Sequence, residues 1–169
     1  LRHVAGKQGI EIGGPSVLFK TTLPLYQRVG SLDGVNFSNQ TTWEGTLVPG
    51  TTFRYFGDRL GQQFIADATD LAQLKDATYD FVLSSNCLEH VANPIKALTE
   101  WRRILKPNSA LILVLPNKDS NFDHRRPITS FEHLLEDFNN EISEKDLTHL
   151  NEILSLHDLS MDPPAGSLE

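Results

Sequence analysis

The chain has 169 residues, of which 39% are hydrophobic, so its length and composition favour one globular domain with its own core. A formal net charge of -7 argues against nucleic acid as a partner, because coating phosphates requires clustered lysine and arginine. The single cysteine excludes an internal disulfide, and no apolar run approaches the ~20 residues that span a bilayer. We therefore expect a cytoplasmic protein that does not bind membranes.

The first element is a buried strand that runs into a glycine turn, "GIEIGG" at residues 9–14. A dinucleotide site requires glycine at the first, third and sixth positions of such a turn. Counting from Gly13, the third position is Pro15 and the sixth is Leu18, so the turn does not suit NAD or FAD in the usual pose. Glu11 lies just before the turn, where an acidic side chain would suit a cationic group.

The following segment predicts a second short strand that includes Val29 and Leu32 and ends at Asp33. Residues 39–61 are rich in glycine and in β-branched and aromatic residues, which is typical of an irregular or hairpin-like insertion. The strand and the insertion together predict extended structure over much of the first third of the chain.

A further apolar run, in "QQFIADATDL", stops at Asp67. Thr69 or Asp70 could cap a short helix through residues 71–76. We therefore expect a third strand followed by one or two turns of helix.

The clearest pattern is a βαβ unit. It begins with the apolar strand residues 81–83, followed by Asn93 as a helix N-cap and Pro94 as the first helical residue. The helix carries an amphipathic stripe and is stopped by Pro107, and the next strand is the apolar "SALILVLPN". The stripe consists of Ile95, Leu98, Trp101, Ile104 and Leu105. Such a unit implies a parallel sheet.

The last part of the chain is predicted to be a polar loop followed by one or two helices that begin near Ser130. Residues 1–160 are expected to form a single domain. Residues 161–169 are expected to be a disordered tail or a linker.

These features resemble the class I S-adenosylmethionine-dependent methyltransferases, and the βαβ unit is similar to that of the type 11 small-molecule methyltransferases. The resemblance is carried by "EIGGPS", "LDG", "IADATDL" and "YDFVLSSNCLEHVANPIKALTEWRRILKPNSALILVLPN". It implies an α/β fold with a Rossmann-like, doubly wound, mostly parallel sheet and S-adenosylmethionine as cofactor. Little after the predicted fifth strand resembles the family's two closing strands, so we expect the sheet to lack them.

The resemblance also implies a set of cofactor-binding residues at the strand ends. Asp33 would bind the ribose hydroxyls and Asp67 the adenine amino group. Each acidic residue alone could be a solvated or capping side chain, but acids at successive carboxyl ends of a parallel sheet favour a site. The cofactor-binding residues expected are Glu11, Gly13, Gly14, Asp33, Asp67, Ala68 and Asn86.

The acceptor side is predicted from residues after the fourth and fifth strands. His90 and His124 are candidate general bases, although a histidine that caps or packs a turn is the simpler interpretation. Arg125 and Arg126 could clamp a carboxylate or phosphate of the acceptor, or could form surface ion pairs.

Several histidines and acids in the last third of the chain imitate a metal-ligand set, but exposed helices usually carry such residues, so we expect no metal. They are His133, Glu136, His149, His157 and Asp158.

The function expected is methyl transfer from S-adenosylmethionine to an O, N or C nucleophile of a small molecule. Two alternatives stay open: an inactive or truncated methyltransferase-like binding or scaffold domain, and a nicotinamide-dependent oxidoreductase.

Overall fold

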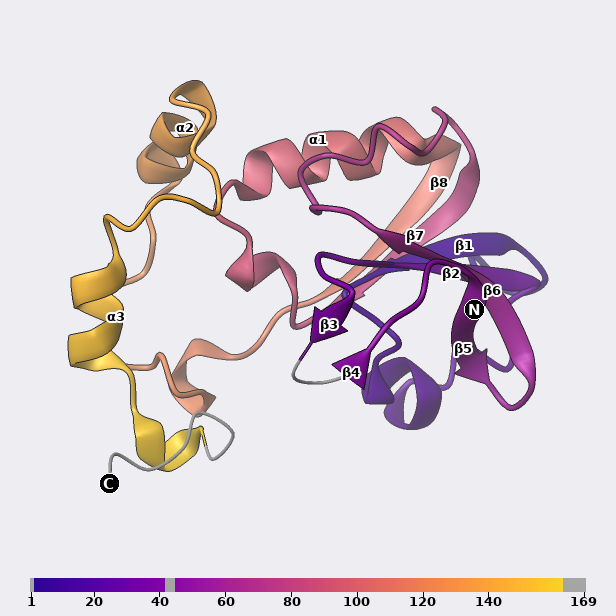
Figure 1. The fold of residues 1–169 in the computed structure, drawn as a ribbon, viewed down its shortest axis with the longest axis horizontal. Helices are drawn as coiled ribbons and strands as arrows, with labels where there is room; N and C mark the ends of the chain where they lie inside the picture. The colour runs from indigo at the N-terminus through magenta and orange to yellow at the C-terminus, as the bar shows by residue number, and fades with distance from the viewer. Residues whose placement is uncertain (1, 42–44, 163–169) are drawn as a thin grey trace.

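The structure, a computed structural model, describes residues 2–41 and 45–162. Within them, six strands form one sheet in the order β5-β6-β2-β1-β7-β8 (Figure 1). The strands are β1 (Gln8–Ile12), β2 (Ser31–Asn36), β5 (Gly50–Phe56), β6 (Arg59–Ile65), β7 (Tyr79–Ser85) and β8 (Leu105–Val114). Only β5 is antiparallel to its neighbour, so the parallel α/β sheet predicted from the sequence is confirmed.

The remaining elements are short. A two-stranded antiparallel sheet joins β3 (Gln40–Thr41) to β4 (Gly45–Thr46). The α-helices are α1 (Pro94–Ile104), α2 (Phe131–Asn139) and α3 (Leu150–Leu156), and the short helical turns are η1 (Leu18–Thr22), η2 (Leu88–His90), η3 (Lys118–Ser120) and η4 (Leu159–Met161). None of the helices in the described ranges has the length and apolar character needed to cross a membrane.

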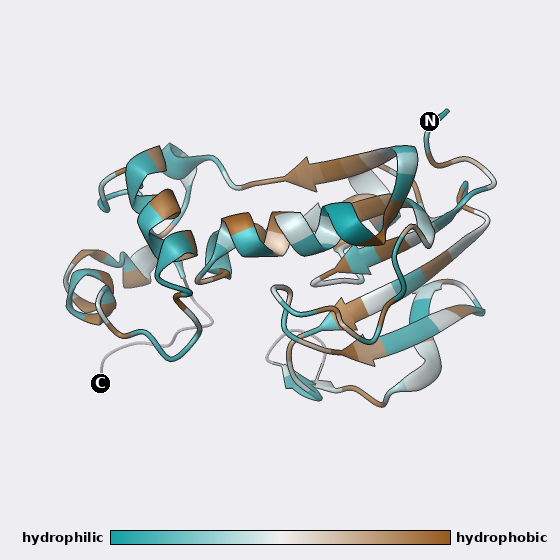
Figure 2. Cartoon of the chain, turned by 90° about the horizontal axis from the view of Figure 1, so that it is seen from above, coloured by the Kyte–Doolittle hydropathy of each residue, from teal (hydrophilic) through white to brown (hydrophobic). Residues whose placement is uncertain are grey.

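Side chains alternate between the two faces of the sheet, and each face has its own core. Val82 of β7 belongs to the core under α1, together with the buried Trp101. Phe81, on the opposite face of the same strand, packs in a second core with Phe19 and Tyr26. Figure 2 shows hydrophobic residues along the strands of the sheet. One face is therefore covered by α1, and the other mainly by the segment after β1, which includes the helical turn η1.

The βαβ unit forms as predicted, but its helix ends and its second strand begins earlier in the chain than predicted. Asn93 caps α1, because its side chain accepts a hydrogen bond from the Lys96 backbone N–H at 3.0 Å. The helix stops at Ile104 and β8 begins at once at Leu105, ahead of the predicted strand start. Pro107 favours the stop, because it disfavours helical backbone at Lys106 and its ring would clash with the Arg103 carbonyl in a continued helix.

The prediction that the second strand ends at Asp33 is wrong. β2 continues three residues further, to Asn36. Gly34 permits this continuation, because the Phe53 ring of β5 lies where a side chain at position 34 would be, 2.2 Å from an added Cβ. The glycine is therefore a packing position inside the strand and not a strand end.

The short helix predicted over residues 71–76 is absent, and this segment consists of turns. The side chains of Asp67 and Asp70 accept hydrogen bonds from backbone N–H groups two residues further on, which favours turns over a helix. The carbonyls of Leu71 and Leu74 are bonded by the Arg103 guanidinium of α1. Several backbone groups that would bond within a helix therefore bond to side chains instead.

The hairpin-like insertion is confirmed in the antiparallel pair β5 and β6, while residues 42–44 lie outside the described part. No strand follows β8 among the residues described. The chain continues to α2 and α3, which lie on the side of the carboxyl ends of β7 and β8 (Figure 1). Of the predicted tail, Met161 ends η4 and Asp162 Oδ2 lies 3.1 Å from His157 Nε2; residues 163–169 are outside the described part.

Candidate functional site

The candidate site lies at the edge of the sheet where the parallel strands β1, β2, β6 and β7 end. Ligands of open α/β sheets bind at this edge, because the loops that follow the strands converge there. The strand ends bring together the glycine turn after β1, Asn36 at the end of β2, Asp67 after β6 and Asn86 after β7.

The glycine turn is closely packed and needs both of its glycines. Gly13 has a φ of 79°, a backbone conformation that favours glycine. A Cβ on Gly13 would lie 2.8 Å from Cys87 Sγ, and one on Gly14 would lie 2.2 Å from Glu11 Cδ. The backbone of the turn can therefore sit directly on the ends of β1 and β7.

Glu11 lies beneath the turn, with a side chain that is 0% exposed. Its Oε2 accepts a hydrogen bond from the Tyr26 hydroxyl at 2.5 Å, and its Oε1 accepts one from the Ser16 N–H at 3.1 Å. The Tyr26 oxygen also accepts from the same Ser16 N–H, at 2.6 Å. Burial, together with the nearby Glu11, raises the pKa of Tyr26, so the phenol keeps its proton and acts as a donor.

This arrangement differs from the expected one, in which Glu11 faced a cationic ligand. The carboxyl group instead bonds to the chain just after the glycine turn and holds it in place. Tyr26 and Ser16 were not recognised in the sequence, since a tyrosine in a polar stretch carries no signal of its partner 15 residues earlier.

Asn36 is the polar residue at the end of β2. It is buried, and its Nδ2 donates to the Gly14 carbonyl at 2.9 Å, which ties the second strand to the glycine turn. Asp33 lies inside β2, where Oδ2 accepts from the Tyr79 hydroxyl at 2.9 Å and Oδ1 from the Gln62 N–H at 2.8 Å. Asp33 therefore joins β2 to β6 and β7. The end of the strand, which the sequence assigned to Asp33, is occupied by Asn36.

The next two strand ends carry the other predicted cofactor residues. Asp67 is half-buried, and its Oδ1 accepts from the Thr69 N–H at 2.7 Å. The Ala68 carbonyl accepts from Trp101 Nε1 at 3.1 Å, which fixes this loop to α1. Asn86 is exposed, with a φ of 49° and its N–H bonded to the Val114 carbonyl at 3.0 Å.

The free thiol of Cys87 lies between the β7 loop and the glycine turn. Its burial raises its pKa to about 11, so it is protonated at neutral pH. The thiol therefore acts here as a packing group against Gly13.

His90 is the candidate base closest in sequence to these strand ends. It ends η2, its side chain is 63% exposed, and its Nε2 lies 3.9 Å from Glu89 Oε1. Its imidazole is therefore exposed to solvent, four residues after Asn86 at the end of β7.

His124 and the two arginines belong to a separate polar cluster. His124 Nε2 lies 3.1 Å from Asp158 Oδ2, and Arg125 donates to the same oxygen at 2.5 Å. Arg126 bonds to Asp123 and to Glu152 of α3, both at 2.9 Å. These contacts fasten the loop after β8 to the C-terminal segment, as the surface ion-pair interpretation of the sequence predicted.

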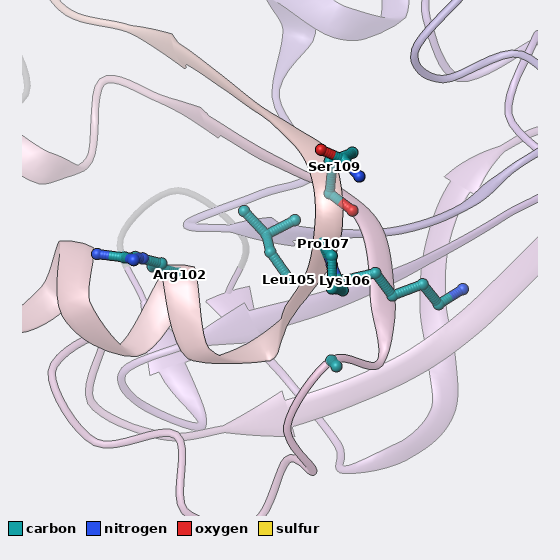
Figure 3. A pocket seen from close by; sticks show the side chains of 7 residues that line it. Arg102, Leu105, Lys106, Pro107 and Ser109 are labelled. Atoms are coloured by element: carbon teal, nitrogen blue, oxygen red, sulfur yellow. The ribbon is translucent and has the colours of Figure 1, made fainter.

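A surface hollow lies at the other end of β8, away from the strand ends described above (Figure 3). It is lined by Ala77, Arg102 and residues 105–109. Lys106 in its wall donates to Asp80 at 2.9 Å. The hollow surrounds the start of the strand and holds none of the predicted site residues.

A parallel sheet with a glycine turn after its first strand and polar side chains at successive strand ends defines a Rossmann-like α/β domain. The chain belongs to the methyltransferase domain family, whose family model matches residues 22–113. This match runs from η1 to β8 and begins after the glycine turn. S-adenosylmethionine is the cofactor that this family implies.

Similar proteins cover only parts of the chain. An uncharacterized protein of Methanocaldococcus jannaschii is 61% identical over 46 residues, which are 27% of this chain and 20% of that protein. An uncharacterized 37.1 kDa protein from a transposon of Streptomyces fradiae is 40% identical over 47 residues, 28% of this chain and 14% of that protein. The chain thus spans a fifth or less of these curated relatives.

One solved structure has the same fold over most of the chain. It is a complex of the Haloferax volcanii Trm112 methyltransferase activator with a protein described as a methyltransferase. The TM-score is 0.52 at 18% identity, over 90% of this chain and 60% of the solved chain. This likeness shows the fold.

Proposed function

We propose that the chain binds S-adenosylmethionine at the carboxyl ends of β1, β2, β6 and β7 and transfers its methyl group to a small-molecule acceptor. The main support for the proposal is the way the glycine turn is fixed by two hydrogen bonds. Glu11 accepts one from the Ser16 N–H, and Asn36 donates the other to the Gly14 carbonyl. A rigid turn with no side chains of its own lets a ligand approach the backbone closely.

The residues at the strand ends fit this cofactor. The Asp67 carboxylate, half-buried after β6, can accept a hydrogen bond from an adenine amino group. The side-chain oxygen of Asn36 can accept one from a ribose hydroxyl while its nitrogen remains on Gly14. When bound, S-adenosylmethionine supplies an electrophilic methyl group on a positively charged sulfur.

The chain's own task is then to align the acceptor and to exclude water. An alcohol or amine acceptor must lose a proton, and we propose His90 as the base because it is exposed beside the end of β7. His124 is a weaker candidate because it already bonds to Asp158. For an acidic acceptor we propose Arg125, which is 51% exposed, ahead of Arg126, which is held by two carboxylates.

A small acceptor is favoured over nucleic acid, because the chain carries a net charge of -7 and would repel a polyanion. A small molecule also needs no extended recognition surface beyond the strand ends.

Calorimetric titration with S-adenosylhomocysteine, the reaction product, tests the cofactor site. We expect saturable binding by the parent chain, binding at least tenfold weaker in Asp67→Ala, and unchanged binding in Asp58→Ala. Asp58 is a matched control because it lies in the exposed turn between β5 and β6, where its side chain pairs with the exposed Arg54 and with no other residue that the structure describes.

Absence of both heat and a thermal shift in the parent chain would refute the proposal and favour a binding or scaffold domain. Saturable NADH binding that S-adenosylhomocysteine does not displace would favour an oxidoreductase. Where cofactor binds, transfer of a labelled methyl group to panels of alcohols, amines and carboxylic acids, measured with His90→Ala and Arg125→Ala alongside, identifies the acceptor class.

A further inference from the structure

The helix α2 presents an apolar stripe to solvent. Phe131, Leu135 and Phe138 follow one another at spacings of four and three residues, which places them on one face of the helix. Their exposed fractions are 63%, 38% and 38%, and Ile128, just before the helix, is 80% exposed. None of the residues of α2 is buried by the part of the chain that the structure describes. The apolar face of this helix is therefore uncovered there.

Polar contacts hold α2 to its neighbours and leave the stripe free. Asn93 Nδ2, at the start of α1, donates to the Asp137 carbonyl at 3.0 Å. His133 lies about half a turn around the helix from the stripe, and its Nε2 is 3.0 Å from Nε2 of His149, which immediately precedes α3. The contact with α3 is thus on the side of α2 away from the stripe. Both helices lie at the end of the molecule opposite the hairpin of β5 and β6 (Figure 1).

The length of α2 makes an uncovered apolar face costly. The helix has nine residues, and isolated helices shorter than about 12–15 residues are marginal in water. Ser130 caps its start by accepting a hydrogen bond from the His133 N–H at 3.2 Å. Most helical stability in folded proteins nevertheless comes from packing an apolar face. A partner that covers the stripe would supply this contribution.

The surface around the stripe is strongly acidic. Residues 131–156 carry seven aspartate or glutamate side chains against one lysine, whereas residues 1–116 carry ten acidic and eleven basic side chains. The exposed Glu132 and Glu136 lie along one side of the stripe. Glu132 forms no hydrogen bond or ion pair with any residue that the structure describes. The net negative charge of the chain is thus concentrated around α2 and α3.

The combination of apolar and acidic groups selects a basic partner. An amphipathic helix docks by laying its apolar face on an apolar surface, and complementary charges at the rim fix its orientation. A second copy of this chain would bring the same carboxylates against one another. An anionic lipid surface or a nucleic acid would be repelled for the same reason.

We propose that the stripe of Phe131, Leu135 and Phe138, with Glu132 and Glu136 beside it, is a docking surface for a basic amphipathic helix of a protein partner. The partner's apolar side chains cover the stripe, and its lysine or arginine side chains pair with the two glutamates. This inference does not depend on the proposed methyl transfer.

Fluorescence anisotropy of the full chain with labelled helical peptides of about 18 residues tests this surface. The first peptide consists of leucine and lysine, with the leucines on one face. The second has the same composition with the leucines distributed around the helix, and the third has glutamate in place of lysine. We expect saturable one-to-one binding of the first peptide, at least tenfold weaker binding of the second, and no binding of the third.

Substitutions in the stripe and beside it locate the binding. We expect Phe131→Ser and Phe138→Ser each to weaken binding of the first peptide at least tenfold, and the double substitution Glu132→Lys with Glu136→Lys to do the same. Phe37→Ser is the matched control, because Phe37 follows β2 and is 76% exposed. Its affinity for the peptide should equal that of the parent chain.

Hydrogen exchange, light scattering and circular dichroism complete the test. The first peptide should slow amide exchange in α2, the parent chain should be a monomer, and the variants should keep the parent's circular dichroism. If Phe131→Ser fails to fold, Leu135→Gln replaces it. No binding by the parent, equal binding of the first two peptides, or unchanged affinity in the stripe variants would overturn the proposal. A dimer of the parent that Phe131→Ser dissociates would also overturn it, in favour of a second copy.

Discussion

Tyr26→Phe is the sharpest test of how the glycine turn is held. The substitution removes one hydroxyl, which donates to Glu11 at 2.5 Å and accepts from the Ser16 N–H at 2.6 Å, and leaves the buried ring in place. Hydrogen bonds to charged groups contribute about 1.5–3 kcal/mol, more than a typical neutral one. Ser16 keeps its bond to Glu11, so the main loss is the bond to the carboxyl group.

We expect the free energy of unfolding to fall by about 2–3 kcal/mol, and Tm by roughly 5–10 °C for a chain of this size. Urea unfolding followed by circular dichroism measures the change. Tyr55→Phe is the control, because Tyr55 is also buried, its ring packs 6.0 Å from that of Tyr26, and its hydroxyl has no hydrogen bond among the described residues. Equal destabilisation by the two substitutions would refute the role assigned to the Tyr26 hydroxyl.

Three further predictions concern other supports of the fold. Gly14→Ala should lower the free energy of unfolding by about 1–3 kcal/mol and weaken S-adenosylhomocysteine binding, because its Cβ would meet a buried carboxyl group at 2.2 Å; unfolding and calorimetry check both effects. Arg103→Ala should cost about 2–4 kcal/mol in urea unfolding, because the guanidinium bonds two loop carbonyls, whereas the exposed neighbour Arg102→Ala should cost under about 0.5 kcal/mol. Hydrogen bonding from Ser160 lowers the pKa of Asp158 from 3.8 to about 2, so its contribution to stability is present above pH 3.8 and is lost as the pH falls through about 2. Acid unfolding followed by circular dichroism should show this loss in the parent and not in Asp158→Asn.

The parts of the fold that the sequence predicts are those built from local interactions. The unit of β7, α1 and β8 combines an apolar strand, the Asn93 cap, Pro94 and an amphipathic stripe, all within a short stretch of chain. Each of these signals acts on residues a few positions away. The parallel arrangement then follows from the handedness and length of the crossover.

The end of β2 could not be predicted in the same way. A glycine after Asp33 looks like a strand end, but Gly34 is paired with β1 and β6 and lies under the Phe53 ring. The ring comes from β5, which is antiparallel to β6 and follows much later in the chain. Since this contact is non-local, the sequence pattern alone placed the polar strand end at Asp33 and missed Asn36.

The loop after β6 also depends on non-local contacts, because its local sequence suits a helix that does not form. Leu71 and Leu74 are buried three residues apart, a spacing that also suits a helix. The Leu74 N–H bonds to the Leu71 carbonyl. The other backbone groups are paired by α1, where Glu100 accepts from the Leu71 N–H and Arg103 donates to both carbonyls. Side chains thirty residues downstream therefore determine whether this segment can be helical.

Glu11 illustrates how the sequence can place a residue correctly in the fold without revealing its hydrogen-bond partners. The sequence places an acid just before the glycine turn, and the structure encloses it there at 0% exposure. A buried carboxyl group requires hydrogen-bond partners, and Tyr26 and Ser16 supply them from the segment after the turn. Its influence on a cofactor must then pass through the shape of the turn. Under the proposed function, selectivity between cofactors would then rest on the side chains that end the neighbouring strands, Asn36 and Asp67.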